Sequence, residues 1–467
     1  MRLAILGSGP GGYVAAIKAA QLGAQVTIIE DVEVGGTCLN WGCIPTKTLT
    51  ATAEALSAAR SLEAFGIELQ GGISPNLAKI MERKTRIVST LIKGIQGLFR
   101  NRAITLKRGR GVLASDREIE VTSSDGTGEK IAADSIIIAT GSRPAEIPSI
   151  PFDGNHVISS TEALEIREVP RRLLIVGAGV IGCEFACIYR ELGSDVTIIE
   201  ALPRAVATED TEISEILEKE LRKKKITLLT GAQIKGATVR DGMVYAQLSD
   251  GRELAGEKIL VSVGRAMNSE NIGVERLGLE RGSRGEILVN GKMGTNVPGI
   301  FAVGDVTGGM LLAHKASAEG IVAAKNIMGI SCSMDYRIIP SAIFTSPEIA
   351  SVGLREQQAL ERGTAFRKGV FPFRALGKAH ASGEVSGIVK VLSDASTDRI
   401  IGAHIIGPHA SDLIHEAAIA MKAGMTAHDL ADTIHAHPTL SEALMEAAED
   451  VNGEAIHLPK KQQVHAG

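Results

Sequence analysis

Short apolar runs that break into glycine recur along the chain, and two of them belong to copies of one larger pattern. Residues 3–6 and 173–176 are apolar, and each run leads through a glycine-rich turn into a helix-like stretch. Both copies end in a second apolar run, at 26–30 and 196–200, within the near-identical segments LGAQVTIIE and LGSDVTIIE. A short buried strand, a turn, a helix and a second strand make the βαβ unit of a parallel sheet. The pattern therefore predicts two βαβ units.

The turn of each unit has the spacing GxGxxG, formed by Gly7, Gly9 and Gly12 in the first copy and by Gly177, Gly179 and Gly182 in the second. The first glycine allows a tight turn, the second lets backbone approach a pyrophosphate, and the third lets the helix pack on the strand. Glu30 and Glu200 end the second strands, where a carboxylate can accept hydrogen bonds from ribose hydroxyls. One such turn is a weak signal, but two in register predict two dinucleotide sites. Glu200 favours NAD at the second site, because a carboxylate repels the extra phosphate of NADP.

Three later apolar runs also break into glycine, at 136–141, 259–265 and 300–305. Each can add a parallel strand whose carboxyl end faces the ligand. After about residue 338 the pattern changes to strand-like segments, such as 388–392 and 400–406, followed by helices. We therefore expect an α/β fold with two dinucleotide-binding, Rossmann-like domains and a separate C-terminal α+β domain.

Composition sets limits on the protein's class. A chain of 467 residues with 44% hydrophobic and 22% charged residues is typical of a multidomain globular protein. The net charge of −4 gives no reason to expect nucleic acid as a partner. No apolar run approaches the roughly 18 residues of a membrane helix, and residues 3–6 are too short for a signal-peptide core. A cytoplasmic protein is therefore expected.

The five cysteines are too few for a secreted disulfide framework, but two of them lie close together. Cys38 and Cys43 belong to GGTCLNWGCIPTK, which follows Glu30 and must lie beside the first nucleotide. A helix beginning near Pro45 would put its positive end at Cys43, and Lys47 would add positive charge, so that the thiolate is favoured. A zinc site would need further ligands at suitable spacing, and no metal site is predicted. The remaining cysteines are interpreted as structural thiols: Cys183, Cys187 and Cys332.

Ten motifs follow one another along the chain: GSGPGG, GGTCLNWGCIPTK, ATGSRP, GAGVIGCE, VGRAMN, VGDV, LLAHKASAEG, FTSPEIASVG, GAHIIGPHASDLIHEA and HAHPTLSEA. With them the chain resembles the pyridine nucleotide-disulfide oxidoreductases, and among these the dihydrolipoamide dehydrogenases, nearly end to end. The resemblance implies a homodimer with one non-covalent FAD per subunit. It also implies four domains: an FAD-binding domain at 1–145, an NAD-binding domain at 146–268, a central domain at 269–337 and an interface domain at 338–467.

The resemblance further implies the residues of both cofactor sites. FAD would lie against the first glycine turn, the end of the second strand, the dithiol segment and four later segments: Gly7, Gly9, Pro10, Gly12, Glu30, Gly36, Thr37, Lys47, Gly111, Thr140, Gly141, Ser142, Asp305, Leu311, Leu312, Ala313 and His314. NAD would lie against the second turn and nearby segments: Gly177, Gly179, Val180, Ile181, Gly182, Glu184, Glu200, Ile234 and Gly264. Asp305 would bind the ribityl chain, and Lys47 would sit near flavin N5, paired with Glu184.

A base for the dithiol is implied by HPTLSE near the end of the sequence. His437 would move protons to and from a thiol, with Glu442 as its orienting acid. The resemblance implies that His437 acts on the partner subunit's dithiol. The chain departs from the family pattern at Met267, where proline is common, and at Leu376 and Lys378, where the family often has asparagine and arginine. These departures put cofactor and partner preferences in doubt, rather than the chemistry.

The expected reaction is oxidation of dihydrolipoamide, through the Cys38 and Cys43 dithiol and FAD, with hydride passed to NAD⁺. The substrate arm would belong to lipoyl domains of an E2 acyltransferase or to the glycine cleavage H protein, and the sequence does not indicate which. One alternative is another NAD(P)H-dependent disulfide reductase of the same fold. The other is a non-catalytic flavoprotein scaffold or redox sensor, in which the basic run 222–225 could dock an acidic partner, although such runs are usually solvated helix faces.

Overall fold

A computed structural model describes residues 1–459 of the chain, which form two compact units. The first unit combines Met1–Val169 with Ser262–Asp335, and the second combines Pro170–Val261 with the residues from Tyr336 onward. Each unit is therefore built from two separate stretches of sequence. The finer division into four domains at 145, 268 and 337 stays a prediction, and residues 460–467 of the last domain lie outside the described residues.

A five-stranded parallel sheet forms the centre of the first unit. Its strands, in spatial order, are β18 (Ile300–Ala302), β7 (Ser135–Ile138), β1 (Arg2–Leu6), β2 (Gln25–Glu30) and β3 (Thr105–Arg108). Four of them are strands that the apolar runs predict, and most of their residues are buried. Because the strands are parallel, the turns after β1, β7 and β18 all emerge at one edge of the sheet.

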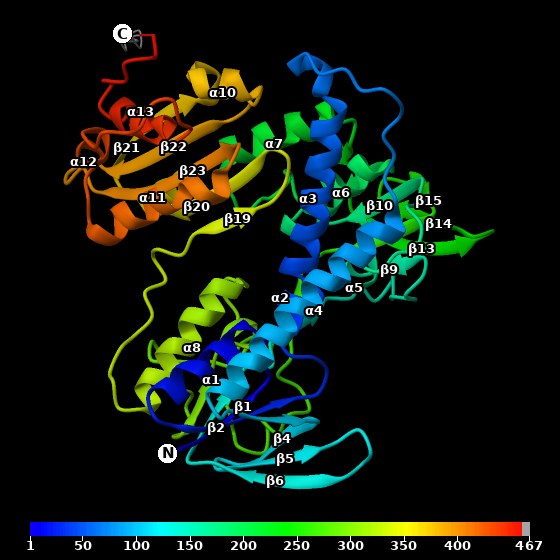
Figure 1. Ribbon diagram of the computed structural model, residues 1–467, viewed down its shortest axis with the longest axis vertical. Coiled ribbons are helices and arrows are strands. Elements are labelled where there is room, and N and C mark those ends of the chain that lie inside the picture. Colours follow the sequence, from blue (N-terminus) through cyan, green and yellow to red (C-terminus); the bar gives the residue numbers. More distant parts are fainter. Residues whose placement is uncertain (460–467) are drawn as a thin grey trace. The chain divides into compact units, whose positions relative to one another are not determined.

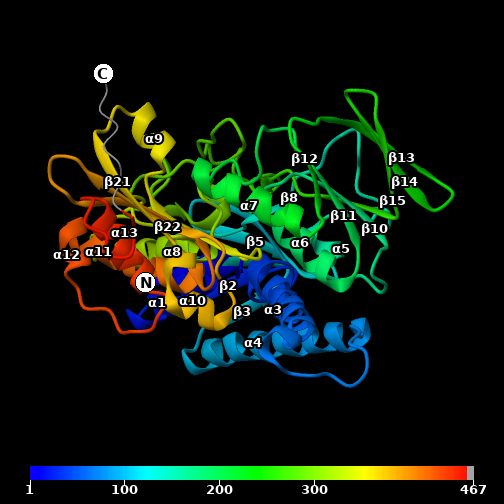
Figure 2. The same cartoon turned by 90° about the horizontal axis from the view of Figure 1, so that it is seen from above.

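Helices cover this sheet, and α1 (Pro10–Gln21) lies side by side with α8 (Ala313–Ile327) (Figure 1). The contact is close because α8 has a glycine where it meets α1: a Cβ on Gly320 would lie 2.4 Å from the carbonyl oxygen of Gly11. The helices α3 (Cys43–Arg60) and α4 (Leu77–Asn101) also pack on each other (Figures 1 and 2). An antiparallel sheet packs on the opposite face of the core: β4 (Arg110–Ser115), β5 (Glu118–Thr122) and β6 (Gly128–Ala132).

The second unit repeats the parallel arrangement with β12 (Thr227–Leu229), β11 (Asp195–Ile199), β10 (Arg172–Val176) and β16 (Lys258–Val261), in that order. The helices α6 (Val180–Leu192) and α7 (Thr211–Lys223) belong to this part. An antiparallel sheet follows in the chain, made of β13 (Ile234–Arg240), β14 (Met243–Leu248) and β15 (Glu253–Gly256). The two predicted βαβ units are thus both confirmed.

The C-terminal part of the second unit is an antiparallel sheet with helices, as the change of pattern predicts. Its strands, in spatial order, are β19 (Ser341–Ile343), β20 (Glu348–Gly353), β23 (Ile400–Gly407), β22 (Ile388–Asp394) and β21 (Phe366–Pro372). The helix α11 (Ala410–Ala423) packs on β20 and β23, and α13 (Glu442–Asp450) packs on β21 and β22 (Figure 1). Within residues 1–459, no helix combines the length and the hydropathy needed to cross a membrane.

Candidate active site

The first glycine turn joins β1 to α1. Gly7 has φ +100°, and a Cβ there would lie 2.4 Å from the carbonyl oxygen of Ala139. A Cβ on Gly12 would lie 2.0 Å from the carbonyl oxygen of Gly7, so that a side chain at either position would collide with backbone. Gly9 caps α1, and the nearest atom to a Cβ there would be Gly36 Cα, at 3.9 Å. The turn therefore presents bare backbone at the positive end of a helix, which fits a pyrophosphate.

Glu30 ends β2 and is held over the same turn, with only 8% of its surface exposed. Its Oε2 accepts hydrogen bonds from the backbone N–H of Ser8 at 2.9 Å and from the Ser8 hydroxyl at 2.6 Å. Its Oε1 accepts a hydrogen bond from the N–H of Val32 at 3.0 Å. The carboxylate is thus fixed in place, and Oε1 keeps a lone pair that a ribose hydroxyl can use.

The dithiol segment follows β2 and forms two helices. Cys38 lies in α2 (Gly36–Asn40), and Cys43 is the first residue of α3. The helix begins at Cys43 rather than near Pro45, because the N–H of Thr46 already donates to the carbonyl of Gly42 at 3.1 Å. Pro45 is tolerated there, since its missing N–H falls in the first turn, where no helical acceptor exists. The positive end of α3 therefore lies at Cys43, as expected from the sequence.

Cys38 and Cys43 are both half-buried thiols, and their side chains are hydrogen-bonded to each other. This hydrogen bond is the largest cause of the raised pKa of Cys38; burial and the charge of Cys43 act in the same direction, and Lys47 opposes them. The raised pKa favours the protonated form of Cys38, and the positive end of α3 favours negative charge on Cys43. The two sulfurs thus have different roles available to them.

Asp305 and the segment Thr140–Ser142 meet at the carboxyl edge of the first sheet. The turn η2 (Gly304–Thr307) follows β18 and carries Asp305, whose Oδ2 accepts a hydrogen bond from the Ser142 hydroxyl at 2.5 Å. The Thr140 hydroxyl donates to the carbonyl of Asn268 at 2.6 Å. The antiparallel pair β8 (Ser142–Pro144) and β17 (Arg265–Met267) holds these segments together. The structure therefore brings the predicted residues of two distant motifs into direct contact.

Two residues of this site were not predicted. Arg265 is mostly buried, and its Nε and Nη2 donate to the hydroxyl and the carbonyl of Ser142, both at 2.7 Å. Burial lowers the pKa of its guanidinium, while Asp305 and Cys43 act in the opposite direction, which places Arg265 near both. Burial, and next the charge of Cys38, raises the pKa of Tyr13 on α1. Arg265 is part of VGRAMN, but only the fold brings it to Ser142, so local spacing carried no signal.

The second glycine turn, after β10, begins with the same backbone geometry as the first. Gly177 has φ +100°, as Gly7 does, and Gly179 caps α6. A Cβ on Gly179 would have no heavy atom within 4 Å, so the end of this helix is open. Glu200 is 8% exposed, and its carboxylate accepts from the N–H groups of Ala178 at 2.5 Å and Leu202 at 2.7 Å. Open backbone beside a fixed carboxylate fits the pyrophosphate and the ribose of a nucleotide.

Glu184 is on α6, downstream of this turn, and is 4% exposed. Its Oε1 accepts a hydrogen bond from the N–H of Phe344 at 2.9 Å. Lys47 is half-buried on α3 and belongs to the other unit, so the expected pairing of Lys47 with Glu184 stays a prediction.

His437 and Glu442 form a pair at the start of α13. His437 Nδ1 lies 2.8 Å from Glu442 Oε1, and Glu442 Oε2 accepts from the N–H of Thr439 at 2.8 Å. Burial alone would raise the pKa of Glu442, but the hydrogen bonds from Thr439 and His437 hold it below the ordinary value. Because a carboxylate can only accept, Nδ1 carries the proton and Nε2 is the basic nitrogen of an imidazole that is 76% exposed.

His435 differs from His437, although the two are close in sequence. Its Nδ1 lies 2.6 Å from the carbonyl of Thr433, and its Nε2 lies 2.5 Å from Glu416 Oε1. Both ring nitrogens are thus engaged, and the side chain is 5% exposed. His437 is therefore the more exposed of the two imidazoles.

For the remaining predicted residues, packing or position at the end of an element also explains the residue type. Gly111 is on β4, and a Cβ there would lie 2.5 Å from Leu6 Cδ1, so packing alone requires glycine. Leu311 and Leu312 precede α8, whose first residues are Ala313 and His314. Other predicted positions lie at the ends of elements: Pro10, Thr37, Gly141, Val180, Ile181, Gly182, Ile234 and Gly264. Of the departures, Met267 is buried in β17, and Leu376 belongs to the core beneath α10 (Gly377–Ser382), which carries Lys378.

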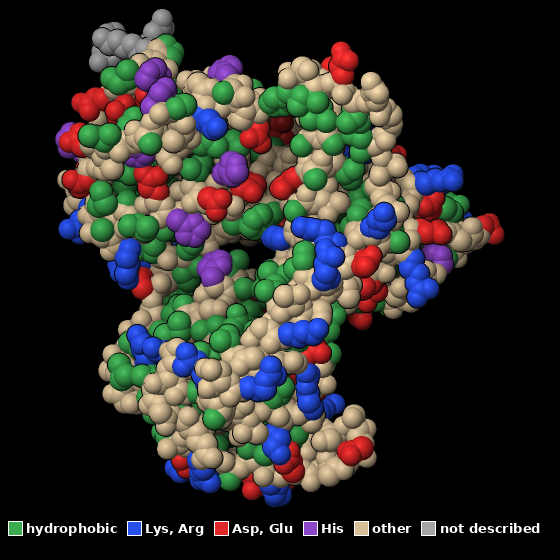
Figure 3. All heavy atoms as spheres, in the orientation of Figure 1, with side chains coloured by type: hydrophobic (Ala, Val, Ile, Leu, Met, Phe, Trp, Pro, Cys, Tyr) green, Lys and Arg blue, Asp and Glu red, His purple; other side chains and the backbone are tan. Residues whose placement is uncertain are grey.

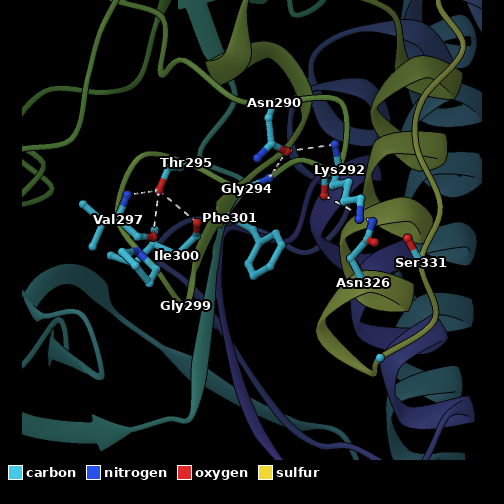
Figure 4. A pocket seen from close by; sticks show the side chains of 12 residues that line it. Asn290, Lys292, Gly294, Thr295, Val297, Gly299, Ile300, Phe301, Asn326 and Ser331 are labelled. Atoms are coloured by element: carbon cyan, nitrogen blue, oxygen red, sulfur yellow. Dashed lines mark hydrogen bonds between the residues drawn. The ribbon is translucent and has the colours of Figure 1, made fainter.

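Within residues 1–459, no metal centre competes with these sites, and the pocket beside β18 does not compete with them either. Several histidines are exposed on the face in Figure 3, yet residues 1–459 hold no group of three or more His, Cys, Asp or Glu suited to a metal ion. A pocket of about 360 Å³ lies beside β18 (Figure 4). Its polar side chains serve its own turns: Asn290 Oδ1 accepts from the N–H groups of Lys292 and Gly294, and Thr295 binds the backbone at Val297. We therefore assign no ligand to this pocket.

Comparison with known proteins agrees with this geometry. Residues 1–320 match the family model of the pyridine nucleotide-disulphide oxidoreductases, and residues 339–448 match the dimerisation domain of that family. The chain belongs to this family: it is a disulfide oxidoreductase that uses FAD and NAD, and it carries the domain through which the family forms dimers.

Individual relatives are similar over nearly their whole length. Dihydrolipoyl dehydrogenase of Chlamydia muridarum is 42% identical over 457 residues, which cover 97% of each chain. Dihydrolipoyl dehydrogenase of Thermus scotoductus is 43% identical over 462 residues, which cover 98% of each. Among solved structures, LpdA of Mycobacterium tuberculosis superposes with a TM-score of 0.91 at 30% identity, covering 96% of this chain and 99% of that one. The expected fold class and family are confirmed.

Proposed function

We propose that the protein oxidises dihydrolipoyl groups to lipoyl groups and reduces NAD⁺. The observation that carries the proposal is the Cys38 and Cys43 pair, with thiols in contact at the positive end of α3 and beside the first nucleotide turn. The names of the relatives support the substrate class, since several dihydrolipoyl dehydrogenases share more than 40% of their residues with this chain.

FAD is proposed at the first repeat and NAD at the second. The pyrophosphate of FAD would lie on Gly7–Gly12, its ribose at Glu30 and its ribityl chain at Asp305, with Lys47 near flavin N5. FAD held there would supply the two-electron chemistry that links the dithiol to NAD⁺. NAD would lie on Gly177–Gly182, with its ribose at Glu200.

The dithiol carries out the exchange with the substrate. In the oxidised enzyme, one substrate thiolate attacks the Cys38 sulfur of the Cys38–Cys43 disulfide, which forms a mixed disulfide and releases Cys43 as a thiolate. The second substrate thiolate then attacks the substrate sulfur of that mixed disulfide, which closes the lipoyl ring and releases Cys38. The raised pKa of Cys38 means that this sulfur takes up a proton on release, whereas the electron pair stays on Cys43. Two electrons thus move from the substrate to the dithiol.

His437 is proposed as the base of this exchange. Its Nε2 removes a proton from the attacking substrate thiol, and Glu442 keeps the imidazole in the required tautomer and orientation. We propose that it serves the dithiol of the partner subunit, so that the active site needs the dimer. Removal of Glu442 would then lower turnover without removing the base itself.

The partners are proposed to be lipoyl domains, either of an E2 acyltransferase or of the glycine cleavage H protein, and the location is proposed to be the cytoplasm. A docking role for residues 222–225 is not favoured. Arg222 is paired with Glu218 at 3.2 Å, Lys223 with Glu220 at 2.7 Å, and Lys224 with Glu191 at 3.2 Å. The run is therefore largely neutralised by its own neighbours.

The proposal is tested by measuring reduction of NAD⁺ and NADP⁺ with three donors: free dihydrolipoamide, glutathione and isolated reduced lipoyl domains. We expect turnover with dihydrolipoamide and lipoyl domains, and with NAD⁺ in strong preference to NADP⁺. Turnover with glutathione and NADP⁺ instead would favour another disulfide reductase of this fold. Absence of NAD⁺ reduction with every donor would favour a non-catalytic flavoprotein.

A variant of His437 separates the base from the cofactors. His437→Gln is expected to abolish most turnover with dihydrolipoamide, while NADH still reduces an artificial dye through FAD. His435→Gln is the matched control, because that imidazole lies close in sequence but binds Thr433 and Glu416. If both variants lose turnover equally, the assignment of the base to His437 is wrong.

A further inference from the structure

A buried ion pair on α8 lies directly behind the turn that carries Asp305. Lys315 and Glu319 are one helical turn apart, 2% and 0% exposed, and their Nζ and Oε1 atoms are 3.1 Å apart. Neither residue takes part in the chemistry described above. Because two buried charges lose their hydration, such a pair is a poor source of stability and needs another explanation.

Both side chains form hydrogen bonds with the backbone of one short turn. Lys315 Nζ donates to the carbonyl of Gly304 at 3.3 Å and to the carbonyl of Gly308 at 3.0 Å. It also lies 3.4 Å from the hydroxyl of Thr307. Glu319 Oε2 accepts from the N–H of Gly304 at 2.8 Å. The pair thus forms hydrogen bonds with the backbone on both sides of Asp305, at Gly304 and at Gly308.

The turn depends on these hydrogen bonds because its backbone conformation is unusual and its glycines are buried. Gly304 has φ +80° and Gly308 has φ +71°, and both are buried. The 3₁₀ turn η2 is only four residues long, so it cannot satisfy all of its own backbone polar groups, and burial without a partner would be costly. At the front of the same turn, Asp305 Oδ2 receives the hydroxyl of Ser142 at 2.5 Å. The Asp305 carboxylate is therefore positioned directly by Ser142 and, through the backbone of the turn, by Lys315 and Glu319.

The same helix also contacts the first glycine turn. Ser317 Oγ lies 3.5 Å from the carbonyl of Pro10, and a Cβ on Gly11 would lie 3.4 Å from the carbonyl of Ala316 (Figure 1 shows α1 and α8 side by side). One helix therefore fixes the Asp305 turn and abuts the start of α1. These are the two segments proposed to hold the ribityl chain and the pyrophosphate of FAD.

We propose that Lys315 and Glu319 are positioning residues for FAD, which set the place of the Asp305 carboxylate without touching the cofactor. This inference rests on the proposed placement of FAD at the first repeat. Loss of the pair would weaken FAD binding more than it weakens the fold, because the turn would be free to move its carboxylate. FAD affinity and protein stability should therefore respond differently to the same substitution.

The test uses the double variant Lys315→Met with Glu319→Gln, which removes both charges and leaves no unpaired ion. The holoenzyme is purified, its rate of flavin release is followed by fluorescence, and the apoprotein is titrated with FAD. We expect the Kd for FAD to rise about 10- to 100-fold, which corresponds to the loss of one or two charge-assisted hydrogen bonds. The thermal midpoint of the apoprotein should change little, since the pair is replaced by uncharged groups of similar volume.

A matched control exists in the second unit, where Lys390 Nζ lies 2.9 Å from Asp210 Oδ1 and both side chains are 1% exposed. The double variant Lys390→Met with Asp210→Asn removes a buried pair that belongs to the other unit, where Lys390 also contacts Glu212 and Glu356. It should leave the Kd for FAD within about twofold of wild type. The milder variant Thr307→Val, which removes one hydroxyl from the turn, keeps the test valid if the double variant at α8 fails to fold, and should speed flavin release.

Asp305→Asn separates failure of this inference from failure of the site itself. If Asp305→Asn weakens FAD binding but the Lys315 and Glu319 variant does not, the positioning role is wrong and the proposed flavin site stands. If neither variant changes the Kd, the placement of FAD at Asp305 is wrong, and the inference fails with it. Equal weakening of FAD binding by the control at Lys390 and Asp210 would also overturn the inference, because the effect would then report general stability.

Discussion

The two nucleotide repeats share one backbone pattern but differ in how far the rest of the protein closes around them. In the first repeat, Gly36 of the dithiol segment packs on the turn so tightly that its Cβ would lie 2.6 Å from Gly9 Cα. In the second repeat, Gly179 holds the same position as Gly9: a Cβ on Gly179 would meet no heavy atom within 4 Å, whereas a Cβ on Gly9 would meet Gly36 Cα at 3.9 Å. A closed turn suits a resident cofactor, and an open one suits a cofactor that binds and leaves in each cycle. The difference therefore supports FAD at the first repeat and NAD at the second.

The carboxylates of the two repeats show the same contrast. Glu30 is held by three hydrogen bonds, two of them from Ser8, whereas Glu200 is held by two backbone N–H groups. The difference arises because Ala178 replaces Ser8 in the second repeat. The first site is thus more rigid before its ligand arrives, which lowers the entropy that binding must remove.

The largest expected effect is that of Gly36→Ala. The added methyl group would collide with backbone, and φ +57° is unfavourable for alanine, so the first turn cannot keep its shape. We expect purified Gly36→Ala to contain almost no FAD, measured by its visible absorbance. Gly179→Ala is the matched control at the open turn: it should retain FAD and raise the KM for NAD⁺. Normal flavin content in Gly36→Ala would show that the first turn does not hold FAD.

Glu200→Ala should have the next largest effect, and only on the nucleotide that exchanges. Loss of a carboxylate that binds ribose hydroxyls removes a charge-assisted hydrogen bond, so the KM for NAD⁺ should rise about 10- to 100-fold. Discrimination against NADP⁺ should fall at the same time, because the repulsive charge is gone. Steady-state kinetics with both nucleotides measures these effects. Loss of FAD, with an unchanged KM for NAD⁺, would reverse the assignment of the two repeats.

The exchange of Ser8 and Ala178 should produce a smaller change. Ser8→Ala removes a buried 2.6 Å hydrogen bond to Glu30, which we expect to stabilise the folded state by about 1 kcal/mol. The thermal midpoint of flavin release should therefore fall by about 2–4 °C. Ala178→Ser in the second repeat should leave that midpoint unchanged. An equal shift from both substitutions would mean that the two carboxylates are equally coupled to FAD.

The smallest effect is expected from an exposed pair at the start of the first repeat. Arg2 donates to Asp134 from its N–H at 2.7 Å and from its guanidinium at 2.8 Å, and mainly the latter bond lowers the pKa of Asp134 from 3.8 to about 2. A lowered carboxylate pKa stabilises the folded state above pH 3.8, and this contribution is lost as the pH falls towards 2. In Asp134→Asn, the free energy of unfolding should therefore fall less than in the wild type as the pH is lowered from 3.8 to about 2. Glu257→Gln, at the corresponding place in the second repeat, is the control. If the stability of Asp134→Asn falls with decreasing pH as that of the wild type does, the pair makes no such contribution.

Local sequence predicted those parts of the site that depend on spacing within one short segment. The glycine turns, Glu30 and Glu200 follow from the fixed length of a βαβ unit, and Cys38 and Cys43 lie next to the first of these. Even the small error in the start of α3 is local, since proline marks the first turn but not its first residue.

Contacts made across long stretches of sequence were not predictable in this way. Arg265 reaches Ser142 only because β17 pairs with β8. Lys315 and Glu319 look like an ordinary helical ion pair in sequence, and their role is visible only when α8 is placed against the turn at Gly304. A single sequence does not show which residues of distant strands lie opposite one another, so these contacts became visible only in the folded structure.

The account rests most heavily on Cys43 facing FAD at the first repeat while Cys38 reacts with the substrate. An anaerobic titration of the holoenzyme with two electrons, followed by absorbance, tests this directly. We expect a long-wavelength band from a Cys43 thiolate against the oxidised flavin in the wild-type protein after two electrons and in Cys38→Ser before any reduction, and none in Cys43→Ser. Persistence of the band in Cys43→Ser, or its loss only in Cys38→Ser, would contradict the account.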